Sequence, residues 1–488
     1  MPPILEADPG IPIRNPTTPY WQVPRHSLAE VSSAKLPAET DVVIIGSGMT
    51  ACSVAKTLLQ QDDSLKMTVL EARGLASGAS SRNGGHIVSP SFQDFGELIE
   101  SFGVTAASEI AEFTLKNIEK TFDVVAEYAG TSLEADSKIR RTEKVIAYID
   151  QTTYDKARRN LRLWNQAMPE HRRDPFRLLG AQEAKVTYGL QNVVGVAVGP
   201  GAAVWPYRLW CGLWSLLLKE YSERLSIETM TPALSVTANP RGRKYTVHTH
   251  RGEIRASHVV YCTNGFTPHL LPRLRGKLFP LRGTMSAQDL GSSFPNRGNA
   301  QSWSFVGQPT TDLETGATSM GLYYLTQDPD SGLMLLGGEH DKAEVVLSSD
   351  DSTLNTTSAE KVLEILPRVF DNVTSTPDAK SIWSGIMGFA RDGLPLIGEL
   401  PAIITGRQEG GEWIAAGFNG YGTAYCLSCG QAVAEMILGK DVSSWMPSAL
   451  LISRERFESG LTSGKFWDGM IGLGDIGKAV APTARSLL

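Results

Sequence analysis

The residues best suited to chemistry in this chain form a short glycine-rich turn that is followed by an acid. Residues 46–51 read Gly-Ser-Gly-Met-Thr-Ala, and Glu71 lies 20 residues after Ala51 (71 − 51). The two glycines let the backbone turn sharply and approach a phosphate closely. A carboxylate at this distance accepts hydrogen bonds from ribose hydroxyls and repels a 2′-phosphate. The pattern predicts an adenine dinucleotide site and disfavours NADP. The alternative is an ordinary glycine turn in an α/β domain.

Two strands and a helix must hold this turn in place. Residues 41–45, Asp-Val-Val-Ile-Ile, suit a buried strand, and residues 67–70 suit a second strand that ends at Glu71. The amphipathic segment 51–60 predicts a helix whose N-terminus offers unpaired N–H groups to the phosphates. Strand, turn, helix, strand and acid therefore follow one another in the order of a Rossmann-like unit.

The composition indicates a soluble globular protein of two or three domains. The chain has 488 residues, 42% of them hydrophobic and 20% charged, with a formal net charge of −6. This balance predicts no nucleic-acid partner and no anionic membrane surface. We find neither an apolar run of about 18 residues nor a signal-peptide core near the N-terminus, so no membrane segment is expected. Five scattered cysteines indicate a reducing compartment, and we expect a cytoplasmic protein.

Cys426 and Cys429 form a Cys-x-x-Cys motif, which can act as a redox pair. The motif lies in a small-residue stretch that predicts a helix, and this setting favours packing. Because the chain has no second pair of ligands of this kind, we expect no metal site.

Two later segments repeat the strand-to-glycine-turn arrangement. Residues 256–265 and 412–417 each lead from apolar residues into a glycine turn. Periodic apolar residues predict further helices, and Pro367 is expected to end one of them; these helices span 104–128, 154–168, 207–221, 358–366 and 424–438. β-rich blocks lie between. If the three strand-to-turn segments build one site, the domains must be discontinuous in sequence.

Four segments together resemble the FAD-dependent oxidoreductases of the D-amino-acid oxidase (DAO) type, which include glycine oxidase, sarcosine oxidase and γ-glutamylputrescine oxidase. The segments occur in the family's order and are residues 46–51 with Glu71, 78–86, 259–265 with 280–283, and 417–422. The likeness spans roughly residues 38–440. The Ser-Arg-Asn-Gly-Gly form looks most like the γ-glutamylputrescine oxidase branch and its fungal relatives, so a fungal-like member is expected.

The resemblance implies a mixed α/β and α+β fold. It consists of a Rossmann-like FAD-binding domain of the glutathione-reductase type and an interleaved substrate domain on a mixed or antiparallel sheet. The expected FAD-binding segments are 38–100, 205–275 and 380–440, and the expected substrate-binding segments are 101–204 and 276–379. Residues 1–37 are expected to form an extended arm, and residues 441–488 a C-terminal extension.

The resemblance also implies which residues surround FAD. Within this set the first turn holds the pyrophosphate, Glu71 holds the ribose, and the last helix points its N-terminus at the N1/O2 side of the flavin, where negative charge builds on reduction. The set comprises Gly46, Ser47, Gly48, Met49, Thr50, Ala51, Glu71, Ala72, Arg73, Ser80, Ser81, Arg82, Asn83, Gly84, Gly85, His86, Ala233, Thr263, Asn264, Gly265, Asp392, Gly417, Asn419, Gly420, Tyr421, Gly422 and Thr423.

Three departures from the family pattern bear on the chemistry. Sarcosine oxidases hold the substrate carboxylate with a lysine just after the terminal glycine turn. Ala424 takes that place here, which removes the usual cation and argues against a sarcosine-like amino acid as substrate. Those relatives also use a lysine in the middle β-block for reaction with oxygen, whereas no lysine lies between Lys277 and Lys342, so an oxidase and a dehydrogenase both stay open. Residues 383–392 contain no cysteine for covalent attachment, so the resemblance implies non-covalent FAD.

Five side chains are candidates for substrate contact, each beside a structural alternative. His86 could bind substrate or move a proton, or simply contact backbone. Tyr323 and Tyr324 occupy one strand, so only one of them can face the substrate, and either could serve packing alone. Arg282 and Arg391 could bind an acidic substrate or pair with nearby carboxylates.

The resemblance implies an enzyme that oxidises a C–H next to an amine nitrogen by hydride transfer to FAD, and O2 is the expected electron acceptor. The expected substrate is a small amine or amino acid. Asp392 is expected to fix its loop. Oxidation of a different C–H in specialised metabolism, or a non-catalytic FAD-binding interaction protein, are the alternatives.

Overall fold

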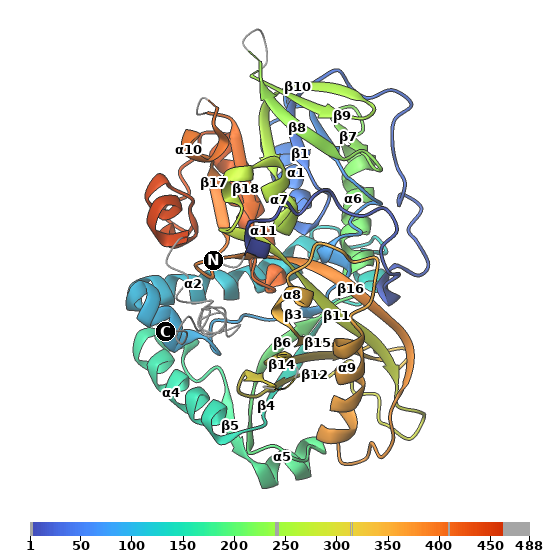
Figure 1. Ribbon diagram of the computed structural model, residues 1–488, viewed down its shortest axis with the longest axis vertical. Helices are drawn as coiled ribbons and strands as arrows, with labels where there is room; N and C mark the ends of the chain where they lie inside the picture. The colour runs from blue at the N-terminus through green and yellow to red at the C-terminus, as the bar shows by residue number, and fades with distance from the viewer. Residues whose placement is uncertain (1–2, 240–243, 313, 315, 408–409, 462–488) are drawn as a thin grey trace, which may run out of the picture.

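Two β-sheets organise the molecule, one above the other in the view of Figure 1. The structure is a computed structural model and describes residues 3–239, 244–312, 314, 316–407 and 410–461. Sheet A has eight strands and lies in the upper part of the view, while sheet B has ten strands and lies in the lower part. The chain passes between the two sheets several times.

Sheet A brings the three strand-to-turn segments side by side. β1 (Glu39–Ile45) pairs in parallel with β10 (Gly252–Tyr261), and β10 pairs in parallel with β18 (Glu412–Ala416). The remaining strands extend this core and are β2 (Met67–Leu70), β7 (Leu225–Glu228), β8 (Ala233–Ala238), β9 (Tyr245–Thr249) and β17 (Leu396–Glu399). Because parallel strands end at the same edge of a sheet, the turns that follow β1, β10 and β18 meet there.

Helices α1 (Met49–Gln61) and α11 (Gly422–Ile437) pack closely beside these strands. A Cβ added to Gly430 would lie 2.6 Å from the Ser53 Cβ and 2.7 Å from the Thr50 carbonyl oxygen. Ser53 Oγ also donates a hydrogen bond of 2.5 Å to the Leu427 carbonyl oxygen. The small residues of α11 therefore let two helices approach that both begin at the same edge of sheet A.

Sheet B is mainly antiparallel. Its one parallel pair among the described strands joins β4 (Arg140–Tyr148) to β12 (Gln301–Val306). Two long strands, β11 (Leu278–Asp289) and β16 (Asp378–Ala390), pair along nearly their whole length. The other strands are β3 (His86–Ile87), β5 (Arg177–Gly180), β6 (Gly195–Ala203), β13 (Thr310–Thr311), β14 (Thr318–Gln327) and β15 (Met334–Asp341).

Each face of sheet B packs against a different part of the molecule. Helix α9 (Thr356–Val369) packs on one face, where its buried Val362, Leu366 and Val369 join the same core as Trp303. The remaining helices are α2 (Phe95–Ala126), α3 (Leu133–Ser137), α4 (Gln151–Ala167), α5 (Ala181–Tyr188), α6 (Pro206–Glu220), α7 (Thr267–Leu270), α8 (Ala343–Val346) and α10 (Ala402–Thr405). The other face of sheet B is turned toward sheet A and encloses the site described below.

The expected fold class is confirmed, with a dinucleotide-type sheet and a second, mainly antiparallel sheet. The strands do not follow the expected segments everywhere. β3 lies within residues 38–100 and most of β16 lies within 380–440, yet both belong to sheet B. Among the described residues, no helix is both long and apolar enough to cross a membrane.

The N-terminal arm is held against sheet B and against the loop 78–86. Leu5 is buried in a small core with Phe279 and Phe389 of sheet B. Trp21 Nε1 donates to the Asn83 carbonyl oxygen at 2.6 Å, and the Trp21 carbonyl oxygen accepts a hydrogen bond from Trp205 Nε1 at 2.7 Å. The arm is thus fixed by burial and by hydrogen bonds to Asn83 of the loop 78–86 and to Trp205.

Candidate functional site

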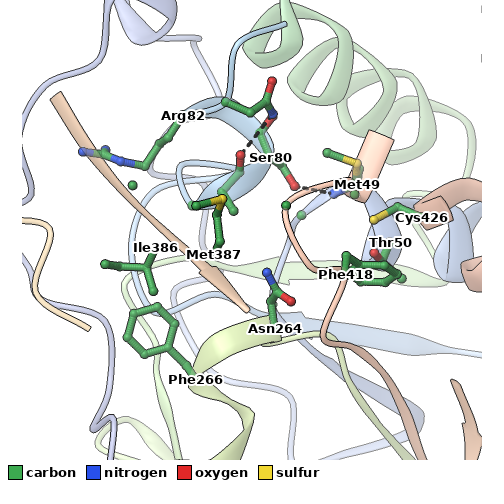
Figure 2. Close-up of a pocket in the computed structure, with 18 of the residues that line it drawn as sticks. Met49, Thr50, Ser80, Arg82, Asn264, Phe266, Ile386, Met387, Phe418 and Cys426 are labelled. Atoms are coloured by element: carbon green, nitrogen blue, oxygen red, sulfur yellow. Dashed lines mark hydrogen bonds between the residues drawn. The ribbon is translucent and has the colours of Figure 1, made fainter. Parts of the chain in front are cut away.

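A large cavity lies between the two sheets. Its wall combines the turns at the edge of sheet A, the loop 72–86, strands of sheet B and residues 10–12 of the N-terminal arm. Figure 2 shows Met49, Thr50 and Cys426 together on one side of the pocket, with Arg82 and Ile386 on the opposite side of the view. All four segments that carry the family resemblance contribute to this wall.

The first glycine turn is shaped by close backbone contacts. Gly46 has φ +103°, and a Cβ there would lie 2.6 Å from the Cys262 carbonyl oxygen at the end of β10. A Cβ on Gly48 would lie 2.7 Å from Ser80 Oγ, which accepts a hydrogen bond of 2.9 Å from the Met49 N–H. Both positions therefore require glycine, one for a backbone conformation that side chains rarely adopt and one for space.

Glu71 lies beside this turn and also lines the cavity. Its Oε2 accepts hydrogen bonds from the Ser47 N–H at 3.0 Å and the Ser47 hydroxyl at 2.6 Å, and its Oε1 accepts one from the Arg73 N–H at 2.8 Å. A carboxylate has about four acceptor positions, so these bonds leave capacity for ribose hydroxyls. Glu71 therefore holds the turn together, and its role toward ribose stays a prediction.

The glycine-rich loop 78–86 crosses from sheet A to sheet B. Asn83 folds the loop on itself, since its Nδ2 donates to the Ala79 and Ser80 carbonyl oxygens and its Oδ1 accepts from the Gly85 N–H. Thr326 Oγ1 of sheet B donates to the Gly84 carbonyl oxygen at 2.7 Å. The loop is consequently a rigid wall of the cavity.

A buried charge cluster supports this loop from behind. Arg73 Nη1 lies 3.0 and 2.9 Å from the two carboxylate oxygens of Asp351, and Arg82 Nε lies 3.5 Å from the same carboxylate. Asp351 is fully buried, and burial lowers the pKa of Arg82 to about 10. Arg73 and Arg82 line the cavity as expected, but Asp351 was not singled out in the sequence, because a lone aspartate in a loop carries no local signal.

The turn that follows β10 and the turn that follows β18 are hydrogen-bonded to each other. Asn264 Oδ1 accepts a hydrogen bond from the Gly417 N–H at 3.0 Å, and Asn419 Oδ1 accepts one from the Ala390 N–H at 2.9 Å. Both asparagines have positive φ, 46° and 52°, which asparagine tolerates better than most side chains. These contacts place the N-terminus of α11 at the cavity, where Thr423 Oγ1 donates to the His86 carbonyl oxygen at 2.9 Å.

The cavity wall fits a bound FAD. The N-termini of α1 and α11 both line it, and each offers N–H groups and a partial positive charge to phosphate or to a charge-accepting ring. Among the described lining residues Glu71 is the only carboxylate, and it lies where a ribose is expected. Apolar side chains such as Met285, Ile386 and Phe418 complete the surface against which flat rings pack.

Most of the expected cofactor residues line this cavity. Those that do are Gly46, Ser47, Gly48, Met49, Thr50, Glu71, Ala72, Arg73, Ser80, Arg82, Asn83, Gly84, His86, Ala233, Thr263, Asn264, Asn419, Gly420, Tyr421, Gly422 and Thr423. Five others, which do not line it, belong to the same turns and helix starts, namely Ala51, Ser81, Gly85, Gly265 and Gly417. Gly85 shows why glycine is needed behind the wall, because a Cβ there would lie 2.5 Å from the Val204 carbonyl oxygen.

His86 lines the cavity and also makes a structural contact. Its Nε2 lies 2.9 Å from Ser302 Oγ on β12. Burial, together with the positive charges of Lys144 and Arg140, lowers the pKa of His86 well below its ordinary value. The imidazole is therefore neutral at pH 7 and can donate or accept one hydrogen bond at each nitrogen according to its tautomer.

The two tyrosines of β14 face opposite sides of sheet B. Tyr324 lines the cavity beside Gly84, where a Cβ would lie 2.8 Å from a ring carbon of Tyr324. Tyr323 instead packs against the core that contains Trp303 and Phe370. Alternation along the strand thus selects Tyr324 as the cavity residue and assigns Tyr323 to packing.

Three charged candidates do not reach the cavity, and this corrects the sequence expectation for them. Arg282 donates to the carbonyl oxygens of Asp350 and Val345 and to Thr353 Oγ1, which turns its guanidinium away from the wall. Arg391 is absent from the cavity lining. Asp392 forms an ion pair with Arg456 at 2.8 Å and fixes its loop, so the cofactor contact expected for Asp392 is not seen.

The cavity also contains residues that the sequence did not reveal. Lys144, Met285 and Ser304 come from three strands of sheet B, and residues 10–12 come from the arm. Ala424, at the position of the family lysine, is fully buried in the core and does not line the cavity. No local motif marks Lys144, Met285 and Ser304, because only the register of sheet B turns these side chains toward sheet A.

The Cys-x-x-Cys motif is a packing feature in this structure. Cys426 and Cys429 are both buried, unpaired thiols on α11. Burial raises the pKa of Cys426 to about 12 and that of Cys429 well above its ordinary value, so neither thiol ionises at neutral pH. In the described part of the chain, no group of three or more His, Cys, Asp or Glu residues could hold a metal ion.

The fold is similar to those of several solved structures. Glycine oxidase from Geobacillus kaustophilus is 16% identical with a TM-score of 0.63, over 86% of this chain and 99% of that chain. L-proline dehydrogenase from P. horikoshii is 20% identical with a TM-score of 0.61, over 87% and 99%. L-amino acid deaminase from Proteus vulgaris, with its specific insertion deleted, is 17% identical with a TM-score of 0.63, over 88% and 98%.

At the level of sequence, no curated protein matches the chain. The comparisons give no support to the expected fungal-like branch. A family model described as DAO, FAD dependent oxidoreductase, matches residues 41–436. Because this match covers 396 (436 − 41 + 1) of the 488 residues, the chain belongs to the DAO family of FAD-dependent oxidoreductases and is an FAD-dependent enzyme.

Proposed function

We propose that this enzyme oxidises a small amine or amino acid at the C–H next to the nitrogen, with O2 as the electron acceptor. Bound FAD supplies the hydride acceptor, and the resulting imine hydrolyses in water. The observation that supports this proposal most directly is a single cavity, which is lined by the dinucleotide turn of sheet A and by polar and aromatic side chains of sheet B. The neighbouring structures named glycine oxidase and L-amino acid deaminase support the substrate class.

The residues of the chain have separate tasks in this proposal. The turn at Gly46 and Gly48 and the N-terminus of α1 hold the pyrophosphate, and Glu71 holds the adenosine ribose. The N-terminus of α11 stabilises negative charge on the reduced flavin. The absence of a cysteine from residues 383–392 supports non-covalent binding of FAD.

On the substrate side, Tyr324 supplies an aromatic wall and His86 a neutral imidazole. A neutral imidazole neither repels a cationic amine nor competes with it for a counter-ion. Hydride transfer needs the amine unprotonated, and because burial and nearby cations disfavour the imidazolium, His86 acts as a neutral hydrogen-bond partner of the amine and not as its proton acceptor. His86 is fixed for this task by Ser302 and by the bond from Thr423 to its carbonyl oxygen.

Anaerobic reduction of the flavin tests the proposal. FAD-loaded protein is mixed with a panel of amines and amino acids and with alcohols of matched size, such as glycine beside glycolate. Bleaching by members of the amine panel, but not by their alcohol counterparts, is the expected result. Recolouring within seconds in air identifies an oxidase, and persistent bleaching identifies a dehydrogenase.

Two results would contradict the proposal. Bleaching by alcohols alone would assign the enzyme to another C–H. A protein that binds FAD but is bleached by no compound of the panel would be a non-catalytic flavoprotein. The covalent question is settled separately, because acid precipitation should release all of the flavin into the supernatant.

A further inference from the structure

Lys144 is a buried lysine in the wall of the cavity. It lies on β4, is 2% exposed, and lines the cavity together with Ser304 of the adjacent β12 and Tyr324 of β14, the next strand beyond. Its register partner on β12 is Ser302, the hydroxyl that contacts His86. A Cβ on Gly201 of β6 would lie 2.9 Å from the Lys144 Cβ, so glycine at that position leaves room for the lysine stem.

Among the residues that the structure describes, no anion pairs with the ammonium of Lys144. Of the cations in the cavity wall, Arg73 and Arg82 share Asp351. For Lys144, the described part of the chain provides neither a hydrogen bond nor an ion pair. The charge of Asp94 acts on Lys144, but no ion pair joins the two residues. Asp94 lies 4.0 Å from Lys156, which pairs more closely with Glu97 at 2.8 Å.

Burying an ammonium group without a counter-ion costs free energy unless a bound ligand supplies the opposite charge. Within the cavity the Glu71 carboxylate does not pair with Lys144, because it lies at the first glycine turn of sheet A, bound to Ser47 and to the Arg73 N–H. The FAD pyrophosphate is assigned to the α1 turn of sheet A, whereas Lys144 belongs to sheet B. The remaining occupant of the cavity is the substrate, and its charge must be negative to match.

We propose that Lys144 binds a carboxylate of the substrate, so that the enzyme selects amino acids over simple amines. This inference rests on the proposed function. The Nζ donates a charge-assisted hydrogen bond to the carboxylate, beside the Ser304 and Tyr324 side chains of the same wall. His86 lies beside the same part of the wall, because Ser302 both contacts His86 and is the register partner of Lys144.

The charge state of Lys144 agrees with this role. Burial lowers the pKa of Lys144 to about 8, and the charge of Asp94 partly opposes that effect. Lys144 is therefore mostly protonated at pH 7, and a bound carboxylate would stabilise the protonated form further.

Binding of a substrate-like anion tests the inference without turnover. FAD-loaded protein is titrated by calorimetry with propionate and with its neutral match, propionamide. Lys144→Met should weaken propionate binding about 10- to 100-fold, as expected for loss of a charge-assisted hydrogen bond, and leave propionamide binding unchanged. Lys144→Arg should restore much of the affinity for propionate. Lys185→Met, an exposed lysine on α5, serves as the control and should behave as wild type.

Several results would overturn the inference. One is equal propionate affinity in wild type and Lys144→Met, including no measurable binding in either. Another is weakened FAD binding in Lys144→Met with propionate affinity retained, which would assign the lysine to the cofactor. A third is a changed rate of flavin reoxidation by O2 with propionate affinity unaltered.

The substrate panel separates this inference from the proposed function. If wild type is bleached by amino acids, Lys144→Met should lose rate for them and keep whatever rate it has for the corresponding decarboxylated amines. Equal loss for both groups would overturn the role of Lys144 and leave amine oxidation intact. If nothing bleaches wild type, the proposed function fails, and the propionate titration still decides whether Lys144 binds an anion.

Discussion

At the scale of single residues, His86 couples the site to pH. Its folded-state pKa lies well below its ordinary value of 6.5, because burial and the charges of Lys144 and Arg140 disfavour the imidazolium. The unfolded chain therefore binds a proton below about pH 6.5 that the folded protein does not bind. The stability associated with neutral His86 is present above that pH and is lost as the pH falls below it.

We expect the free energy of unfolding of wild type to fall more steeply than that of His86→Gln between pH 6.5 and 5. The difference in slope should approach about 1.4 kcal/mol per pH unit for a single proton. Urea denaturation at several pH values measures it. The slope is the readout, because loss of the contact with Ser302 lowers stability at every pH. Parallel curves for the two proteins would contradict the neutral assignment.

Gly46 illustrates a different constraint on a single residue. We expect Gly46→Ala to destabilise the protein by about 3 kcal/mol or more and to abolish FAD binding, because it combines a positive φ with a Cβ 2.6 Å from a carbonyl oxygen. Gly130→Ala is the matched control, since Gly130 has φ +87° and no atom within 4 Å of an added Cβ. That control should cost only about 1 kcal/mol and retain FAD. Equal effects would show that conformation alone, and not crowding, makes glycine necessary. Thermal unfolding and flavin absorbance supply the two readouts.

At the scale of elements, the buried Arg73–Asp351–Arg82 cluster joins the glycine-rich loop to the loop before α9. Asp351 accepts from Arg73 through its carboxylate and from Thr17 of the arm through its carbonyl oxygen. Asp351→Asn leaves two buried arginines without their anion and should cost about 3–5 kcal/mol in urea denaturation. Glu364→Gln, which breaks the exposed pair with Lys361 on α9, should cost less than about 1 kcal/mol. Similar losses in the two variants would mean that the buried cluster contributes little.

Helix α9 shows where an element was misjudged from sequence. Pro367 was expected to end this helix, yet α9 continues to Val369. The prediction was wrong because Leu366 and Val369 are buried against sheet B, and this packing offsets the hydrogen bond that proline removes near the last turn. Tertiary contact thus overrides local preference at a helix end.

At the scale of the whole molecule, the arm closes the cavity that the two sheets form. Residues 10–12 line it, and Leu5 is buried against sheet B. Deletion of residues 1–13 should therefore speed FAD release several-fold and lower the stability by about 2 kcal/mol, the approximate contribution of burying Leu5. The rise of flavin fluorescence after dilution measures release. Glu6→Gln, at an exposed position of the arm, is the control, and an unchanged release rate in the deletion variant would contradict the closing role.

The sequence by itself determined the local parts of this protein. The strand 67–70, the turn at Gly46 and Gly48, and the helix after residue 422 were all predictable. Such features depend on backbone sterics and on the spacing of apolar residues over a few positions, so they can be read within a short window. The ordered set of four segments then identified the FAD-dependent fold.

Only the tertiary structure decided which side chains meet in the cavity. The sequence gives no reason to prefer Tyr323 or Tyr324 as the substrate-side residue. The register of the strand alone turns Tyr324 to the cavity. No local pattern marks Lys144 or Asp351. Asp351 matters because it pairs with Arg73, more than a hundred residues away, and Lys144 because no residue of the described part of the chain pairs with its charge. Arg282 and Arg391, chosen for their charge, lie elsewhere. Non-local pairing sets which face of a strand is enclosed, and that information is spread over the whole chain.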